Sequence, residues 1–181
     1  MGFTGTDTVE RLFINGVQQP PGVYGSAHAS GRFAGDGTLT VTTGPAATAY
    51  ESWETDNGIG GAGSTEDSDN DGIPNGIEFV LGGDPSGPDS DSSSLLPTGT
   101  RDGTHLVIVF RRTDASIGDD PVVQYGSTLD DWTPAVDDVE DVAIEVEDDF
   151  YDTGIDKVTV RLPLALAVDG KLFARLAVEI P

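Results

Sequence analysis

Apolar and polar residues alternate along the last part of the chain, with turn residues between the alternating runs. The segment His105–Arg111 is apolar on both faces, which is typical of a central strand. Further strands are expected at Pro121–Tyr125, Val142–Glu147, Lys157–Leu164 and Lys171–Ile180. Several short strands separated by turn signals predict an antiparallel β-sandwich.

The beginning of the chain has the same period of two over shorter stretches. We expect a strand at Arg11–Val17, an extended piece at Val23–Tyr24 and a strand at Thr38–Thr43, where threonine alternates with apolar residues. No internal repeat at a fixed period is evident. Residues 1–43 therefore predict β packing without a chemical site.

The period changes after Gly44, where a helix is expected. Pro45 suits the first position of a helix, and Ala46, Tyr50 and Trp53 then share one helical face. Asn57–Gly58 should end this helix, because both residues tolerate the left-handed backbone of a helix end.

A second helix is expected after a polar, glycine-rich stretch. Pro74 marks its start, and Ile77, Phe79, Val80 and Leu81 supply its apolar contacts. Gly82–Gly83 should end it. The two helices and the loop between them predict a helix-loop-helix insert in an otherwise β-rich chain.

The expected organisation has three parts. Residues 1–43 form a β-strand segment, residues 44–84 the helix-loop-helix, and residues 95–181 an antiparallel β-sandwich module. A linker rich in Ser, Pro and Asp near Pro85–Pro97 separates the last two. The predicted fold class is thus mainly β, with antiparallel β-sandwich-like segments and one short helical insert.

The balance of charged residues limits the classes of partner that the chain can bind. The chain has 9 Lys and Arg against 32 Asp and Glu, a formal net charge of -23. Such a field repels nucleic acid and anionic membranes and attracts cations. No apolar run approaches the ~20 residues needed to span a bilayer, so we expect neither nucleic-acid binding nor membrane insertion. Cysteine is absent, and a bound metal is one alternative way to stabilise such a module outside the cell.

The strongest chemical signal is the segment Asp67–Glu78. Its sequence DSDNDGIPNGIE matches the calcium-loop pattern D-x-[DN]-x-[DN]-G-x5-E at every specified position. Calcium takes about six to eight oxygen ligands, which such a loop supplies from a short stretch of chain. The expected ligands are the carboxylates of Asp67, Asp69 and Asp71, the backbone carbonyl of Ile73, Asn75 through a water, and a bidentate Glu78.

Without a cation, four neighbouring carboxylates raise one another's pKa and repel. A solvated acidic loop is the alternative interpretation, because a chain this acidic contains some aspartate-rich runs by chance. That alternative does not explain Gly72 at the sharp turn, Glu78 at the closing position, or the helical pattern that begins just afterwards. Calcium binding is therefore the preferred interpretation.

The stretch from Tyr50 to Pro85 resembles the EF-hand-like, dockerin-like or thrombospondin type 3-like calcium repeat. That repeat occurs near the C-termini of large surface proteins of planctomycetes and verrucomicrobia. Other stretches resemble further parts of the same proteins. Leu12–Val17, Gly22–Gly25 and Gly35–Val41 are similar to the closing strands of their autotransporter-associated β-strand repeats, and Phe110–Arg112, Ser127–Trp132 and Leu172–Leu176 to their final β module.

The resemblance implies an exported, non-catalytic C-terminal region, located outside the cell or at its surface. It also implies that such loops sometimes hold a second ion sharing Asp69, Asp71 and Glu78, with Asp84 nearby; one ion is expected here. Two features depart from the pattern. Gly76 weakens the start of the second helix by up to ~1 kcal/mol relative to alanine, and a second, paired loop is missing, so cohesin-type docking is not expected.

Other acidic residues are weaker candidates for a cation site. Every charged residue from Asp114 to Asp156 is acidic. One interpretation is a second cation site, and the other is a solvated surface that resists aggregation; we prefer the latter because the spacing fits no ligand template. The residues considered for that site are Asp119, Asp120, Asp148, Asp149 and Asp152.

Enzymatic activity is not expected. Carboxylate pairs that would suit a glycosidase are unavoidable in so acidic a chain, and no G-x-S-x-G elbow accompanies His28 and His105. Trp53 is expected to anchor the core, whereas the exposure of Trp132 is left open.

Three functions remain as hypotheses. The first is a calcium-stabilised structural or adhesion module of an exported bacterial surface protein, with surface proteins or glycans as partners. The second is a subunit of a self-assembling extracellular filament or surface layer, in which a strand of the first segment pairs with a neighbouring copy. The third is a carbohydrate-binding module that uses Trp132.

Overall fold

The computed structural model describes residues 4–28, 32–87, 92–119 and 121–180. The chain forms two compact units, Met1–Ala47 and Thr48–Pro181. Both are built mainly of β-strands, as the alternation predicts. Residues 44–84, expected as a segment of their own, contribute both α-helices to the second unit.

The first unit contains short strands in two small sheets. One sheet has the order β1–β5–β4, and the other is a β2–β3 hairpin. The strands are β1 (Thr6–Val9), β2 (Phe13–Ile14), β3 (Val17–Gln18), β4 (Gly22–Tyr24) and β5 (Thr38–Val41). Only Tyr24 and Val41 are buried among the described large apolar residues of this unit.

Strands β1 and β5 pair in parallel and repeat the same short sequence. Gly5–Val9 and Gly37–Val41 both read Gly-Thr-x-Thr-Val, and the register places like residues opposite each other, including Val9 opposite Val41. The hydroxyls of the first threonine in each strand lie 3.1 Å apart. The two occurrences were not recognised as a repeat from the sequence, because a motif found twice defines no period.

The strand expected at Arg11–Val17 is wrong. The chain reverses inside this segment, because Asn15 and Gly16 have φ angles of 54° and 85°. Both central residues of a type I′ turn need positive φ, and Asn-Gly is the preferred pair. The result is the tight β2–β3 hairpin, in which Ile14 lies opposite Val17.

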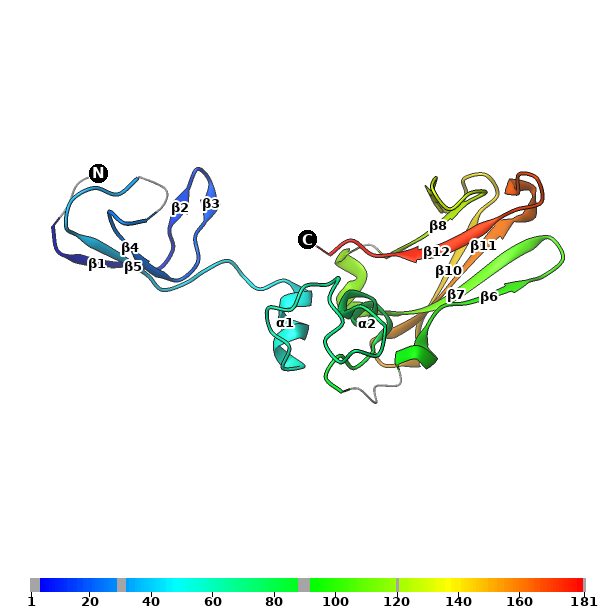
Figure 1. Cartoon of the computed structure of the whole chain (residues 1–181), viewed down its shortest axis with the longest axis horizontal. Helices are drawn as coiled ribbons and strands as arrows, with labels where there is room; N and C mark the ends of the chain where they lie inside the picture. Colours follow the sequence, from blue (N-terminus) through cyan, green and yellow to red (C-terminus); the bar gives the residue numbers. More distant parts are fainter. Residues whose placement is uncertain (1–3, 29–31, 88–91, 120, 181) are drawn as a thin grey trace. The chain divides into compact units, whose positions relative to one another are not determined.

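The second unit is an antiparallel sandwich of two sheets. One sheet has the order β10–β11–β7–β6 and the other β12–β8–β9, and Figure 1 shows β8 and β12 facing the larger sheet. The strands are β6 (Thr98–Arg101), β7 (His105–Thr113), β8 (Val122–Gly126), β9 (Thr133–Pro134), β10 (Ala143–Asp152), β11 (Ile155–Pro163) and β12 (Phe173–Ala177).

The core lies between these sheets. The register pairs Val158 with Phe110 and Val160 with Ile108, so that one face of β7 and β11 is a continuous apolar surface. Val123 of β8 covers it from the opposite sheet. The prediction that β7 is a central strand is confirmed, because β11 and β6 flank it.

The predicted strand boundaries need corrections at the edges. β10 extends five residues beyond Glu147 to Asp152, whereas β12 ends at Ala177 instead of Ile180. The short strands β6 and β9 were not expected, because Thr98–Arg101 is exposed throughout and has no apolar alternation. Short edge strands of this kind carry a weak pattern.

The helix expected from Pro45 starts four residues later. Helix α1 spans Ala49–Asp56, and Thr48 is its N-cap: its hydroxyl accepts from the backbone N–H of Glu51, whose carboxylate accepts from the N–H of Thr48. This reciprocal capping box fixes the start. The predicted end at Asn57 is confirmed, and Ala46 lies outside the helix.

The second helix, α2, spans Asn75–Leu81 with Pro74 as its N-cap, as predicted. Beyond it, the segment near Pro85–Pro97 contains a buried proline, Pro85, and a 3₁₀ helix, η1 (Ser92–Leu95), whose Leu95 packs against the core. The other 3₁₀ helices are η2 (Asp114–Asp119) and η3 (Leu164–Leu166). None of the helices within the described ranges has the length and apolarity that crossing a membrane requires.

A buried tyrosine makes the stability of the second unit sensitive to alkaline pH. The hydroxyl of Tyr125 donates to Oε2 of Glu140 at 2.6 Å, and this bond together with burial raises the pKa of Tyr125 to about 12. The phenol of an unfolded chain has a pKa of about 10. The stabilisation is therefore complete below pH ~10 and is lost as the pH rises towards ~12.

We expect the melting temperature to fall less steeply between pH 10 and 12 in Tyr125→Phe than in the wild type. Thermal unfolding followed by circular dichroism checks this. Parallel pH profiles for the two proteins would show that Tyr125 does not carry the effect.

Candidate metal centre

The acidic loop between α1 and α2 is anchored by the helix that follows it. Phe79, Val80 and Leu81 of α2 are at most 1% exposed and belong to the core of the second unit. Helix α2 is also tied to β7, because the hydroxyl of Thr113 donates to the carbonyl of Phe79 at 2.9 Å. The loop thus ends on a rigid element, and Glu78 lies in its first turn, as predicted.

Three predicted ligands converge in this loop. Carboxylate oxygens of Asp67, Asp69 and Asp71 all lie within 4.8 Å of one another. Each carboxylate also accepts a hydrogen bond from the backbone within the loop: Asp67 from Gly72, Asp69 from Asp71, and Asp71 from Ile73, at 3.0, 3.1 and 2.8 Å. These bonds orient the side chains towards a common centre.

The oxygens that remain after this bonding are the main evidence for a cation. Oδ1 of Asp67 and Oδ2 of Asp69 are buried and accept no hydrogen bond from any residue that the structure describes. Burying a charged oxygen without a partner is costly. Carboxylate oxygens are the ligands that hard divalent cations prefer. The residues present therefore fit a bound metal ion.

The backbone of the loop turns where the pattern requires it. Gly72 has a φ of 95°, a conformation that side chains rarely adopt. Asn70, two residues earlier, has a φ of 64° and lies in the left-handed region that asparagine tolerates. The two turns bring the alternate aspartates to the same side of the loop.

Asn75 and Ile73, the other loop residues predicted as ligands, are also buried. Asn75 is 0% exposed; its Oδ1 accepts from the N–H of Ser68 at 3.1 Å, and its Nδ2 donates to the carbonyl of Gly63 at 3.2 Å. This side chain joins the start of the loop to the chain before it, a role that the motif did not indicate. Water-mediated ligation by Asn75 and carbonyl ligation by Ile73, which is 5% exposed, stay predictions.

Glu78 is 0% exposed but does not belong to the group of carboxylates that lie within 4.8 Å of one another. Its surroundings are negative. The pKa of Tyr50 is raised to about 12, first by burial and then by the charge of Glu54, with smaller contributions from Glu66 and Glu78; its hydrogen bond with Asn75 acts in the opposite direction. A cation near these groups would offset part of that negative field.

Glu54 was missed in the sequence. It is 5% exposed although it carries a carboxylate, and it follows Tyr50 by four residues on α1. The spacing alone signals a shared helical face, but nothing in the motif linked this face to the acidic loop.

The other acidic candidates do not form a comparable group. Within the described ranges, no oxygens of Asp119, Asp148, Asp149 or Asp152 meet as those of the loop do, and Asp120 lies outside those ranges. Instead, Asp149 accepts from the N–H of Gly154 and Asp152 from the N–H of Thr153, which shapes the β10–β11 turn. Asp84 accepts from Ser86, and these hydrogen bonds lower the pKa of Asp84.

The aromatic candidates take part in packing. Trp53 contacts Tyr50 and Phe79, with ring centroids 5.6 and 5.5 Å apart, and packs against the core. This confirms its expected role as an anchor. Trp132 is half-buried, and the guanidinium of Arg175 lies 4.3 Å from its ring centroid, covering one face of the ring.

The two histidines lie in different local settings. His28 packs against the rings of Tyr24 and Phe33. His105 lies at the start of β7, where Nδ1 is 2.9 Å from the hydroxyl of Thr104 and 3.4 Å from Oδ1 of Asp102.

The close packing around the start of α2 explains why residue 76 is a glycine. Its N–H donates to the carbonyl of Ser64 at 2.8 Å, and a Cβ at this position would lie 2.9 Å from that oxygen and 3.1 Å from Cδ1 of Ile180. Overpacking of this kind costs about 1–3 kcal/mol, which outweighs the ~1 kcal/mol that alanine gains in a helix. We expect Gly76→Ala to lower the free energy of unfolding by up to about 2 kcal/mol, measured by urea denaturation.

The matched control is Gly118→Ala. A Cβ at Gly118 meets nothing within 4 Å, so this change should be neutral. Equal stability of the two variants would contradict the close contact between Gly76 and Ser64.

Comparison of the chain with protein-family models, with curated proteins and with solved structures finds no match.

Proposed function

We propose that residues 48–181 are a calcium-stabilised, non-catalytic structural or adhesion module of an exported bacterial surface protein. The observation that carries the proposal is the pair of buried oxygens on Asp67 and Asp69 that accept no hydrogen bond from any described residue. A third aspartate, Asp71, brings its carboxylate to the same centre. An acidic loop that only served solubility would expose these oxygens to water.

A bound ion would supply positive charge to oxygens that otherwise repel one another. The three aspartates would hold it, with Ile73, Asn75 and Glu78 as further ligands. The hydrogen bonds from the backbone to the three aspartates already fix the shape of the loop. Phe79, the residue after Glu78 on α2, packs in the core. Occupation of the loop would therefore stabilise the helices and the sandwich together.

The assignment to an exported surface protein rests on the resemblance of the stretch from Tyr50 to Pro85 and of the flanking strands. The net charge of -23 and the absence of cysteine agree with a module that relies on cations for stability. The non-catalytic role is supported by the position of the acidic loop, whose carboxylates are engaged in the turn itself.

Thermal melting in calcium and in EGTA tests this function. At free calcium ten- to a hundredfold above the dissociation constant, linkage gives about 1.4–2.7 kcal/mol of stabilisation. For a unit of this size we expect the midpoint in calcium to lie roughly 3 to 11 °C above that in EGTA. Magnesium is the matched control, because its smaller, more rigid coordination shell suits this loop less well. Identical midpoints in calcium and EGTA would remove the proposal.

A second candidate function is self-assembly through the first unit. Strand β1 lies at the end of its sheet, and among the described strands it pairs only with β5. The N–H groups of Thr38 and Thr42 donate to Gly5 and Val9, so the backbone of Thr8 faces the open edge. An open edge of this kind accepts a further strand, and the Gly-Thr-x-Thr-Val match with β5 indicates which strands would stack on it.

Sedimentation of the whole chain in calcium tests this candidate. We expect concentration-dependent association of the wild type and its loss in Thr8→Pro, because proline removes the N–H at the open edge while edge positions tolerate it. Thr42→Ser, outside β1, is the control. A wild-type protein that stays monomeric at all concentrations would rule the candidate out.

A further inference from the structure

A cavity lies between the two sheets of the second unit, away from the acidic loop. Its volume is about 410 Å³, and most of its lining is apolar. Both sheets contribute, with Phe110, Val123, Ala135, Ile144, Val146 and Val160 among the lining residues. The cavity is open to solvent on one side, where Val146 is 40% exposed, and pockets of roughly 300–1,000 Å³ are the size that binds small molecules.

Two charged side chains, Arg112 and Asp137, are among the described residues that line this cavity. Arg112 lies on β7 two residues after Phe110, so both face the inside of the sandwich. Its Nη2 pairs with Oδ2 of Asp156 at 2.7 Å, and Asp156 is 3% exposed. The Nε–H of the same guanidinium is buried and has no acceptor among the residues that the structure describes. A buried N–H of this kind is destabilising until an acceptor reaches it.

The charges around the cavity indicate a neutral acceptor. Asp156 already balances the charge of Arg112. Asp137 also lines the cavity, and the whole chain has a formal net charge of -23. A ligand carboxylate would meet this field unfavourably, whereas a hydroxyl or carbonyl oxygen would accept from Nε without adding charge.

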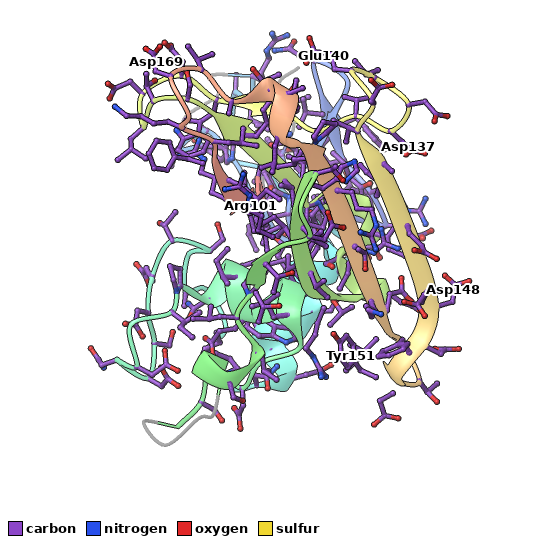
Figure 2. The ribbon with its side chains drawn as sticks, turned by 90° about the vertical axis from the view of Figure 1, so that its right-hand side faces the viewer. Arg101, Asp137, Glu140, Asp148, Tyr151 and Asp169 are labelled. Atoms are coloured by element: carbon purple, nitrogen blue, oxygen red, sulfur yellow. The ribbon has the colours of Figure 1, made fainter. Side chains whose placement is uncertain are left out.

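The occupant is better explained as a small molecule than as an added strand. β10 is the edge strand beside the cavity, and Oδ1 of Asp137, in the loop before it, already accepts from the N–H of Ile144 at 2.8 Å. Figure 2 shows Asp137 and Glu140 near one end of β10 and Asp148 farther along it. Charged residues along an open edge oppose strand pairing.

We propose that this cavity binds a neutral amphipathic small molecule, with its apolar chain between the sheets and a hydroxyl or carbonyl oxygen accepting from Nε of Arg112. The apolar lining provides the affinity for the chain, and the single buried donor selects the polar end. Such a site is independent of the calcium loop.

Methyl-resolved NMR of the calcium-saturated protein, titrated with decan-1-ol, tests the proposal. We expect saturable shifts at Val123, Val146 and Val160, and at least tenfold weaker binding of decanoate at pH 7. Arg112→Lys keeps a cation for Asp156 but lacks Nε. It should weaken decan-1-ol binding roughly ten- to a hundredfold, the range of one hydrogen bond that involves a charged group.

Val146→Phe provides a second variant that narrows the cavity. Val146 is 40% exposed on an edge strand, so the larger ring should leave folding intact, and decan-1-ol binding should be lost. Circular dichroism spectra like that of the wild type, with a cooperative thermal transition, show that both variants are folded. The proposal is overturned if the wild type shows no saturable shifts, if decanoate binds as tightly as decan-1-ol, or if neither variant changes the binding.

Discussion

Replacing Phe79 with alanine is expected to lower the free energy of unfolding of the second unit by about 3–5 kcal/mol. Phe79 is 1% exposed, and its ring contacts Tyr50 and Trp53 with centroids 5.4 and 5.5 Å away. The substitution leaves a cavity where α1, α2 and the sandwich meet. Because Phe79 adjoins Glu78, the apparent calcium affinity should fall as well.

Phe150→Ala is the matched control for this prediction. Phe150 is 52% exposed on β10 and contacts Lys157 through its ring face, so its loss should cost less than about 1 kcal/mol. Urea denaturation in calcium measures both variants. Comparable losses for the two phenylalanines would contradict the packing of α2 against the core.

Asp69→Asn is expected to separate the two effects of the acidic loop. The asparagine keeps an oxygen that accepts from the N–H of Asp71, as Oδ1 of Asp69 does now, but it removes one negative charge. In EGTA the variant should be at least as stable as the wild type, because repulsion from Asp67 and Asp71 is weaker. In calcium it should lose part of the about 1.4–2.7 kcal/mol that binding provides, because an amide oxygen still ligates calcium but carries no charge.

The control for Asp69→Asn is Asp148→Asn, which makes the same change of charge on an exposed residue of β10. It should respond to calcium like the wild type. Melting curves compare each of the two variants with the wild type, once in calcium and once in EGTA. If Asp69→Asn destabilises the protein equally with and without calcium, Asp69 acts through the fold alone and not through an ion.

The sequence predicted the features that rest on strong local patterns. The mainly β fold, the central strand at His105–Arg111 and the start of α2 at Pro74 follow from alternation and from helix-end residues, and the structure confirms them. The convergence of Asp67, Asp69 and Asp71 follows from their alternate spacing in the acidic loop. Short-range geometry determines each of these features.

Features that depend on particular contacts were missed. The hairpin at Asn15–Gly16 was missed because the apolar residues on both sides of this pair were read as one strand, and Thr48 was overlooked as an N-cap because Pro45 offered an earlier start. Gly76 looked like a weakness of α2, whereas the carbonyl of Ser64 leaves no space for a side chain. The burial of Glu54 likewise depends on packing between distant segments.

Calorimetric titration of calcium into the EGTA-treated and dialysed chain tests the central claim most directly. Buried aspartate oxygens in a preformed loop should take up one calcium ion per chain, with saturating heat and with lower affinity in Asp69→Asn, which keeps an oxygen ligand but loses a charge. Absence of any calcium uptake up to about ten millimolar, by heat or by equilibrium dialysis, would contradict the assignment of Asp67–Glu78 as a metal site.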